Sequence, residues 1–134
     1  MEKKTILITN YDLLNIIVWF DDENGWYKST KLPISIRRMC KNIIKKLNEL
    51  KSNYDEDEKD ALGEYRDSKH SDPIKGDSGL RKVKKEYLSE FNKARLELLS
   101  IKSELEFIPL PHSAFDDMDI LDKDYRILDL FLDE

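Results

Sequence analysis

The strongest constraint on the fold is a run of seam residues spaced three and four positions apart through the middle of the chain. The run comprises Ile36, Cys40, Ile43, Leu47, Leu50, Tyr54, Asp57, Ala61 and Tyr65. This is heptad spacing, which predicts a long helix with one seam that faces a partner. Pro33 stands where a first helical residue is favoured, so we expect this helix to cover about 34–66.

The same spacing resumes after a polar interruption. Residues 67–79 include Pro73, Gly76 and Gly79, which are typical of turns, and we expect a mobile loop there. The second set of seam residues comprises Leu80, Val83, Tyr87, Phe91, Ala94, Leu98, Ile101 and Leu105. It predicts a second helix over about 79–105. Two such helices joined by a short loop pack antiparallel.

An antiparallel register follows, because facing positions in such a pair have a constant sum. The predicted pairs are Cys40 with Leu105, Leu47 with Leu98, Tyr54 with Phe91, Tyr65 with Leu80, Ile43 with Ile101, Leu50 with Ala94, Asp57 with Tyr87 and Ala61 with Val83. We expect the Tyr87 hydroxyl to bind the Asp57 carboxylate, and the Cys40 thiol to be buried as a small hydrophobic group. The register also places the acidic segment 55–67 beside the basic segment 81–85.

The ends of the chain predict a small base for this hairpin. Residues 4–9 form a β-branched run, typical of a strand, and residues 11–20 continue as a helix capped by Asn10 or Thr9. Residues 26–28 are expected as a loop or short extended piece. A strand at 105–111 would pair with 6–9, since a lone strand leaves its backbone groups unpaired.

A last amphipathic helix is expected at about 123–132, after a linker at 112–119. Its inner face would carry Ile127, Leu128, Phe131 and Leu132. The predicted fold class is therefore mainly α, of the α+β type: a long antiparallel helical hairpin on a base of two short strands, an N-terminal helix and a C-terminal helix, in one domain over 1–134.

Composition narrows the class of protein. A chain of 134 residues buries one core and rarely two. The sequence contains no apolar run of the roughly 18–20 residues that cross a bilayer, and we see no secretory signal at its start. With a single cysteine it has no intrachain disulfide, so we expect a cytoplasmic location.

The order of these pieces resembles a known family. The matching segments are Leu7-Ile8-Thr9-Asn10 before an apolar helix, Lys31-Leu32-Pro33 before a heptad helix with Lys41-Asn42-Ile43, then Leu62-Gly63-Glu64-Tyr65, Glu90-Phe91-Asn92-Lys93, Leu98-Leu99 and Glu104, and an acidic amphipathic end. These are similar to small phage and prophage proteins of low-GC Gram-positive bacteria, a domain of unknown function. The resemblance implies a viral accessory protein in a bacterial cytoplasm and carries no catalytic residue.

The patterns that suggest catalysis or metal binding are weak. Residues 76–79 match the nucleophile turn of some serine proteases, but His70 and His112 lie in predicted loops and no large scaffold surrounds them. The two histidines and one cysteine form no zinc ligand set. The paired acids Asp116-Asp117 and Asp122-Asp124 fit a polar linker and a helix cap. We therefore expect no enzyme activity, metal or cofactor.

The one candidate site is the start of the helix at 34–66. Helix N-termini favour negative charge, yet basic residues gather there, and such cations with free N–H groups suit phosphate, a nucleotide or an acidic protein surface. The predicted site residues are Lys31, Arg37, Arg38 and Lys41, with a second, looser face formed by Lys82, Lys85, Asn92 and Lys93. Alternatively, Glu104, Glu106 and the acidic tail neutralise the patch, since the register puts Arg38 near Phe107 and Lys41 near Glu104.

These observations favour a non-enzymatic binding protein of phage origin that blocks a host nuclease or defence complex by protein contact or charge mimicry. The alternatives are a sponge for an anionic nucleotide and a virion structural or assembly protein. Nucleic-acid binding is a rival only for the hairpin, where basic residues can hold phosphates. It is less favoured, because the pI is about 5.2 and residues 104–134 hold ten acids against two bases. Trp19, Phe20 and Trp26 are a large apolar supply for a small base, which would suit a homo-oligomer.

Overall fold

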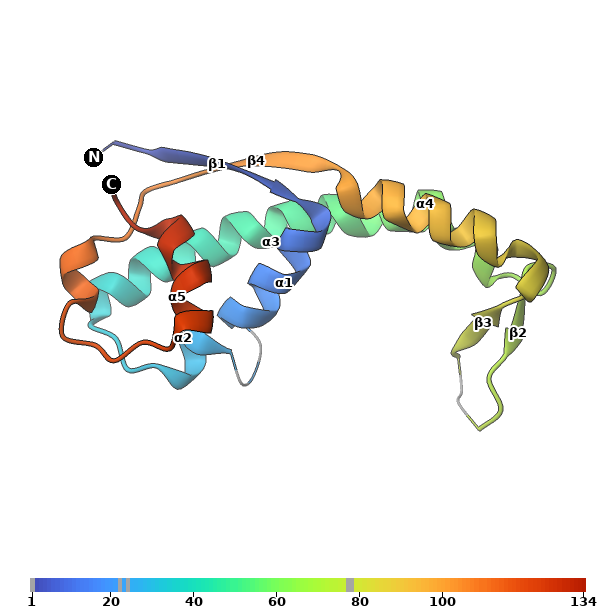
Figure 1. Cartoon of the computed structure of the whole chain (residues 1–134), viewed down its shortest axis with the longest axis horizontal. Coiled ribbons are helices and arrows are strands. Elements are labelled where there is room, and N and C mark those ends of the chain that lie inside the picture. The colour runs from blue at the N-terminus through green and yellow to red at the C-terminus, as the bar shows by residue number, and fades with distance from the viewer. Residues whose placement is uncertain (1, 22, 24, 77–78) are drawn as a thin grey trace. The chain divides into compact units, whose positions relative to one another are not determined.

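The structure, a computed structural model, describes residues 2–21, 23, 25–76 and 79–134. It is a mainly helical α+β protein, as predicted (Figure 1). Its contacts divide the chain into a base unit, Met1–Lys51 with Lys102–Glu134, and a hairpin unit, Ser52–Ile101. Helix α3, Ile34–Leu62, contributes residues to both units, and each unit is described by itself.

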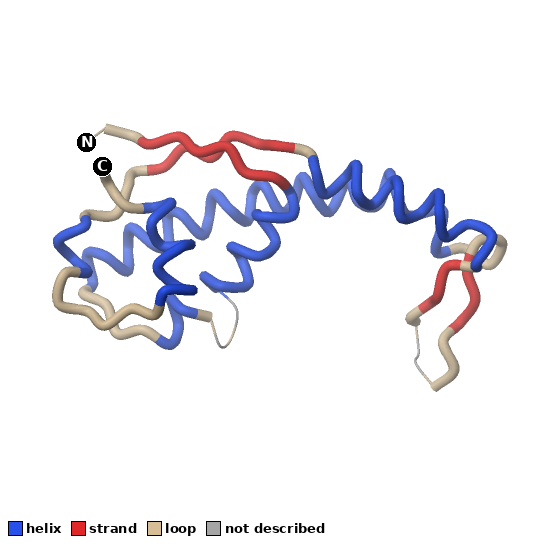
Figure 2. Tube along the Cα trace, in the orientation of Figure 1, coloured by secondary structure: helices blue, strands red, loops and turns tan. Residues whose placement is uncertain are grey.

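The base unit contains a two-stranded antiparallel sheet (Figure 2). Strand β1, Lys4–Thr9, pairs with β4, Lys102–Phe107, so that Ile6 lies opposite Leu105. The predicted pairing is confirmed, but β4 lies at 102–107 and the predicted strand at 105–111 was displaced. Residues 102–107 alternate with a period of two: Leu105 and Phe107 are buried, whereas Glu104 and Glu106 are exposed.

Helix α1, Asn10–Asp21, matches the predicted helix at 11–20. The Asp12 backbone N–H donates to Thr9 Oγ1 at 3.1 Å, so Thr9 satisfies one of the free N–H groups at its start. A second helix, α2, occupies Trp26–Ser29, where a loop or extended piece was predicted. That prediction was wrong because a helical turn places both Trp26 and Tyr27 in the core, where they are buried.

The C-terminal segment completes the base unit. It forms the 3₁₀ turn η3, His112–Phe115, then α5, Asp122–Leu128, and the 3₁₀ turn η4, Asp129–Phe131. The predicted helix at 123–132 thus ends in a 3₁₀ turn. Phe131 is fully buried, with its ring centroid 5.4 Å from that of Phe20 and 5.3 Å from that of Phe107. The inward face predicted from the spacing is therefore the core face.

Helix α3 confirms the long helix expected at 34–66, with its last residues in the 3₁₀ turn η1, Gly63–Arg66. Along its base-unit part four seam residues are buried, Ile36, Cys40, Ile43 and Leu47, and Leu50 is half-buried. The heptad spacing therefore identified the buried face in this part of the helix. In the hairpin unit it did not, because Asp57 and Ala61 are exposed and Leu62 is buried instead.

The second predicted helix was wrong at both ends. Residues Arg81–Val83 form strand β3, which pairs antiparallel with β2, Ser71–Pro73, inside the predicted loop at 67–79. Gly76 and Gly79 adopt φ of +86° and +92°, which lets the chain reverse between the strands. A 3₁₀ turn η2, Lys85–Tyr87, follows, and α4 covers only Leu88–Ser100 before β4 begins.

Within the hairpin unit the end of α3 and α4 pack side by side, but not in the predicted register. The Tyr65 ring lies 5.5 Å from the Phe91 ring, whereas its predicted partner Leu80 is 56% exposed. Tyr54 and Phe91 do share one cluster, built on Leu62, Tyr65 and Leu98. The extra residues of the β-ribbon shift the register, because they place the turn between the helices further along the chain.

Two further expectations in this unit were wrong. Asp57 is exposed and the Tyr87 ring lies against His70 at 4.6 Å between centroids, and among the described residues no hydrogen bond joins the Tyr87 hydroxyl to the Asp57 carboxylate. Arg81 belongs to β3 and donates to Ser71, so it does not lie on a helix beside the acidic segment 55–67.

Candidate anion-binding surface

Three basic residues of α3 share one exposed face of the helix. Arg38, Lys41 and Lys45 are spaced three and four apart, which brings them onto one side, and all three are exposed. Cys40, Ile43 and Leu47 lie on the other side and are buried in the base unit. We call Arg38, Lys41 and Lys45 the basic stripe.

Arg37 and Lys31, which were predicted as part of the same site, are placed differently. The Arg37 guanidinium lies over the Tyr27 ring, 4.8 Å from its centroid, and Arg37 is half-buried. The Tyr27 hydroxyl donates to the Arg37 carbonyl oxygen at 3.5 Å. Arg37 therefore stabilises the junction of α2 and α3 through a cation–π contact. Lys31 is exposed in the loop before α3.

Three of the acids expected to neutralise the basic stripe bind other groups, and Glu104 is exposed without an ion pair among the described residues. Glu106 pairs with Lys3 at 3.3 Å, Asp124 accepts a hydrogen bond from Trp19 Nε1 at 2.9 Å, and Asp133 contacts His112 Nδ1 at 2.6 Å. Arg38, Lys41 and Lys45 form no ion pair with any other described residue. The stripe is thus available to an external anion.

Arg38 was predicted near Phe107 and Lys41 near Glu104 on the assumption that the second helix continues to about 105. That helix, α4, ends at Ser100, and residues 102–107 form strand β4. Instead, Lys46 Nζ donates to the Glu106 carbonyl oxygen at 2.6 Å, so a later turn of α3 contacts β4. The stripe was recognised from its charge, but Lys45 was left out. Its spacing of four from Lys41 was the signal that could have included it.

The second predicted face does not form on one helix. Asn92 and Lys93 are exposed on α4, whereas Lys82 lies in β3 and Lys85 in η2. All four belong to the hairpin unit and not to the unit that holds the basic stripe.

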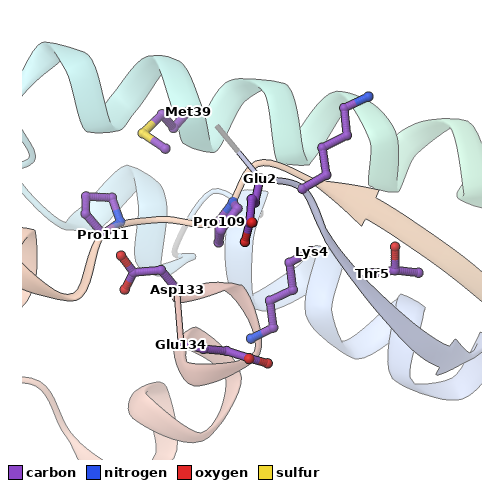
Figure 3. A pocket seen from close by; sticks show the side chains of 9 residues that line it. Glu2, Lys4, Thr5, Met39, Pro109, Pro111, Asp133 and Glu134 are labelled. Carbon is purple, nitrogen blue, oxygen red and sulfur yellow. The ribbon is translucent and has the colours of Figure 1, made fainter.

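An open hollow of about 700 Å³ lies where the two ends of the chain meet (Figure 3). Its lining carries charges of both signs: Glu2, Lys3, Lys4, Thr5, Met39, Pro109, Pro111, Asp133 and Glu134. Lys4 Nζ is already bound to the Leu132 carbonyl oxygen at 2.9 Å.

The side chains of Cys40, Asp67 and Asp133 have shifted pKa values because of contacts within the chain. Burial raises the pKa of the Cys40 thiol to about 12, although the Arg37 charge opposes this, and the residue is fully buried as predicted. A hydrogen bond from the His70 side chain lowers the pKa of Asp67, and one from His112 lowers that of Asp133. Of the protease-like segment 76–79, Asp77 and Ser78 lie outside the described residues.

Of the three aromatic residues that favour an oligomer in the sequence, two are buried and the third packs against one of them. Phe20 and Trp26 are buried, and Trp19 stacks on Trp26 with ring centroids 5.0 Å apart. Oligomerisation stays a prediction.

In the described part of the chain, no three His, Cys, Asp or Glu side chains are grouped so that they could hold a metal ion. None of the described helices combines the length and apolar character that crossing a bilayer requires.

The fold and this surface define a class of protein, a small α+β chain with an exposed cationic helix face. Comparison with family models, curated proteins and solved structures finds no match for the chain. The resemblance to small phage proteins therefore stays a prediction.

Proposed function

We propose that this chain is a non-enzymatic binding protein that contacts an anionic surface of a partner protein through the basic stripe. The observation that carries the proposal is the exposure of Arg38, Lys41 and Lys45 without an ion pair among the described residues. Because these three side chains share one helix face, they can form charge-assisted hydrogen bonds with carboxylates of a partner.

The partner we propose is a bacterial host factor, such as a nuclease or a defence complex, blocked in the cytoplasm by a phage-encoded chain. The resemblance to small phage proteins favours this setting. Nucleic-acid-binding host proteins also present charged surfaces, and the acidic C-terminal segment could occupy a basic one as a charge mimic. Contact by the stripe is the version that the following experiment tests.

The experiment is capture from host lysate by the tagged full chain, combined with plaque assays on a host with active defence. We expect Arg38→Glu/Lys41→Glu to abolish capture and protection of the phage. Lys123→Glu/Arg126→Glu, an equal charge change at exposed positions of α5, should retain both. Equal loss in both variants, or capture of nothing by the natural chain, would contradict the proposal.

A second candidate function is a sponge for an anionic nucleotide. The feature that favours it is the position of Arg38 just after the first turn of α3, whose N–H groups favour an anion, with Lys31 as a further exposed cation in the loop before it. Calorimetry against a panel of cyclic nucleotides separates the two candidates. A nucleotide that binds the natural chain but not Arg38→Ala/Lys41→Ala would favour the sponge, and no binding by any of them would exclude it for the panel.

A further inference from the structure

The hairpin unit contains a two-stranded β-ribbon that the sequence did not reveal. Beyond the paired strands, Ile74 N–H donates to the Leu80 carbonyl at 3.2 Å and Lys84 N–H donates to the His70 carbonyl at 2.8 Å. The ladder therefore spans residues 70–74 and 80–84, and we call the described residues 69–76 and 79–85 the β-ribbon. Its strands are joined by the turn that contains Gly76 and Gly79.

Hydrogen bonds fasten the base of the β-ribbon. Ser71 is buried, and its Oγ donates to the Asp67 carbonyl at 2.7 Å. Arg81 donates from Nε to Ser71 Oγ and from Nη2 to the Ser71 carbonyl, both at 2.8 Å. The His70 ring contacts the Tyr65 and Tyr87 rings. The ribbon is thus held at its base while its outer part reaches solvent.

The charge of the β-ribbon is strongly positive although the whole chain is acidic. The sequence from 69 to 85 contains six basic residues against Asp72 and Asp77. Arg81 is engaged with Ser71, which leaves five lysines, none of which forms an ion pair with another described residue: Lys69, Lys75, Lys82, Lys84 and Lys85. All but the half-buried Lys84 are exposed. Such a cluster favours a polyanion over a single small anion.

Apolar residues accompany these lysines at the outer end of the β-ribbon. Ile74 is 41% exposed and Leu80 is 56% exposed, and they are joined by the last hydrogen bond before the turn. A two-stranded ribbon fits the major groove of B-form DNA, and exposed aliphatic side chains beside lysines can pack against sugars and bases.

We infer that the β-ribbon binds double-stranded DNA, with its lysines on the phosphates and with Ile74 and Leu80 against a groove. This surface is separate from the basic stripe of the proposed function, since the two belong to different units of the chain. The contact is predominantly electrostatic and carries little sequence preference, because lysine–phosphate contacts do not read bases.

The test is fluorescence anisotropy of a labelled DNA duplex titrated with the full chain over a series of salt concentrations. We expect binding at low salt that weakens steeply as salt rises. Lys75→Gln/Lys82→Gln, which changes two exposed side chains, should bind about tenfold more weakly. The slope of log affinity against log salt is negative, and its magnitude should fall by roughly two in this variant, since each phosphate contact contributes about 0.9. Circular dichroism checks that the variant is folded.

The matched control is Lys41→Gln/Lys45→Gln, which removes the same charge from the basic stripe. It should retain the natural affinity and slope for DNA. The inference is overturned if the natural chain does not bind at low salt, if both variants lose affinity equally, or if a single strand binds more tightly than the duplex. Capture of a host protein is tested with substitutions in the basic stripe, and DNA binding with substitutions in the β-ribbon. A failure of the DNA-binding inference is therefore distinguishable from a failure of the proposed function.

Discussion

Single residues of the base unit show how burial, more than chemistry, determines their roles. Cys40 is the clearest case: it has a thiol, but burial raises its pKa to about 12, so at neutral pH it is protonated. The thiolate is the reactive species, and a protonated, buried thiol is inert. The residue acts as a small hydrophobic side chain on the inner face of α3.

We accordingly expect Cys40 not to react with iodoacetamide in the folded protein and to be modified rapidly in denaturant. Mass spectrometry of the intact chain measures the modification. Fast labelling without denaturant would contradict the buried position of this thiol.

Phe131 lies at the centre of the aromatic core, between Phe20 and Phe107. Phe131→Ala should lower the free energy of unfolding by about 3–5 kcal/mol, because it removes a buried ring and leaves a cavity. Its neighbour Leu130 is 38% exposed, so Leu130→Ala is the control and should cost far less. Chemical denaturation followed by tryptophan fluorescence measures both.

The pKa of Asp67 predicts how stability depends on pH. The carboxylate is stabilised by the His70 side chain, so its folded pKa lies below the ordinary value of 3.8. A lowered folded pKa contributes stability above the ordinary value, and this is lost as pH falls through the folded value. We therefore expect Asp67→Asn to have a lower melting temperature at neutral pH, with the difference shrinking below pH 3.8.

Melting curves recorded by circular dichroism over a pH series test this expectation. Asp72→Asn is the matched control, because Asp72 is exposed on the neighbouring strand. A constant difference between Asp67→Asn and the natural chain at every pH would show that the carboxylate charge is not involved.

Secondary-structure elements depend on local signals that can be tested one at a time. The start of α1 is the simplest, because the Thr9 hydroxyl accepts a hydrogen bond from the Asp12 N–H. Thr9→Ala should lower the free energy of unfolding by about 1 kcal/mol, whereas Thr9→Ser retains the acceptor. Urea denaturation of both variants measures the difference, and equal losses would mean that the side-chain methyl is what matters.

The whole molecule distributes its core unevenly between its two units. The described residues of the hairpin unit include three buried apolar side chains, Leu62, Tyr65 and Leu98, and every other buried apolar side chain belongs to the base unit. Because burial of apolar area is the dominant stabilising contribution, the hairpin unit should open more readily.

Hydrogen exchange measured by mass spectrometry tests this difference. We expect amides of α4 and of the β-ribbon to exchange faster than those of β1 and β4. Equal protection in both units would indicate that the chain unfolds in one cooperative step.

The candidate site was only partly predictable from sequence. Spacing along α3 places Arg38 and Lys41 on the exposed face, because the apolar residues identify the buried one. The separate role of Arg37 was not predictable, because it depends on Tyr27, which is brought against α3 by a helical turn that local signals did not indicate.

Sequence alone determined the elements in which local preference and periodicity agree: strand 4–9, the helix after it, the long helix from 34 and its buried face. Tertiary structure decided between helix and strand in the segments whose residue spacing fits both. Residues 80–84 fit heptad spacing but pair with residues 70–74 as a ribbon, because two glycines allow the turn. Residues 85–87 fit the same spacing but form the 3₁₀ turn η2. Residues 102–104 were expected in a helix but belong to the strand, because β1 offers backbone partners to all of residues 102–107.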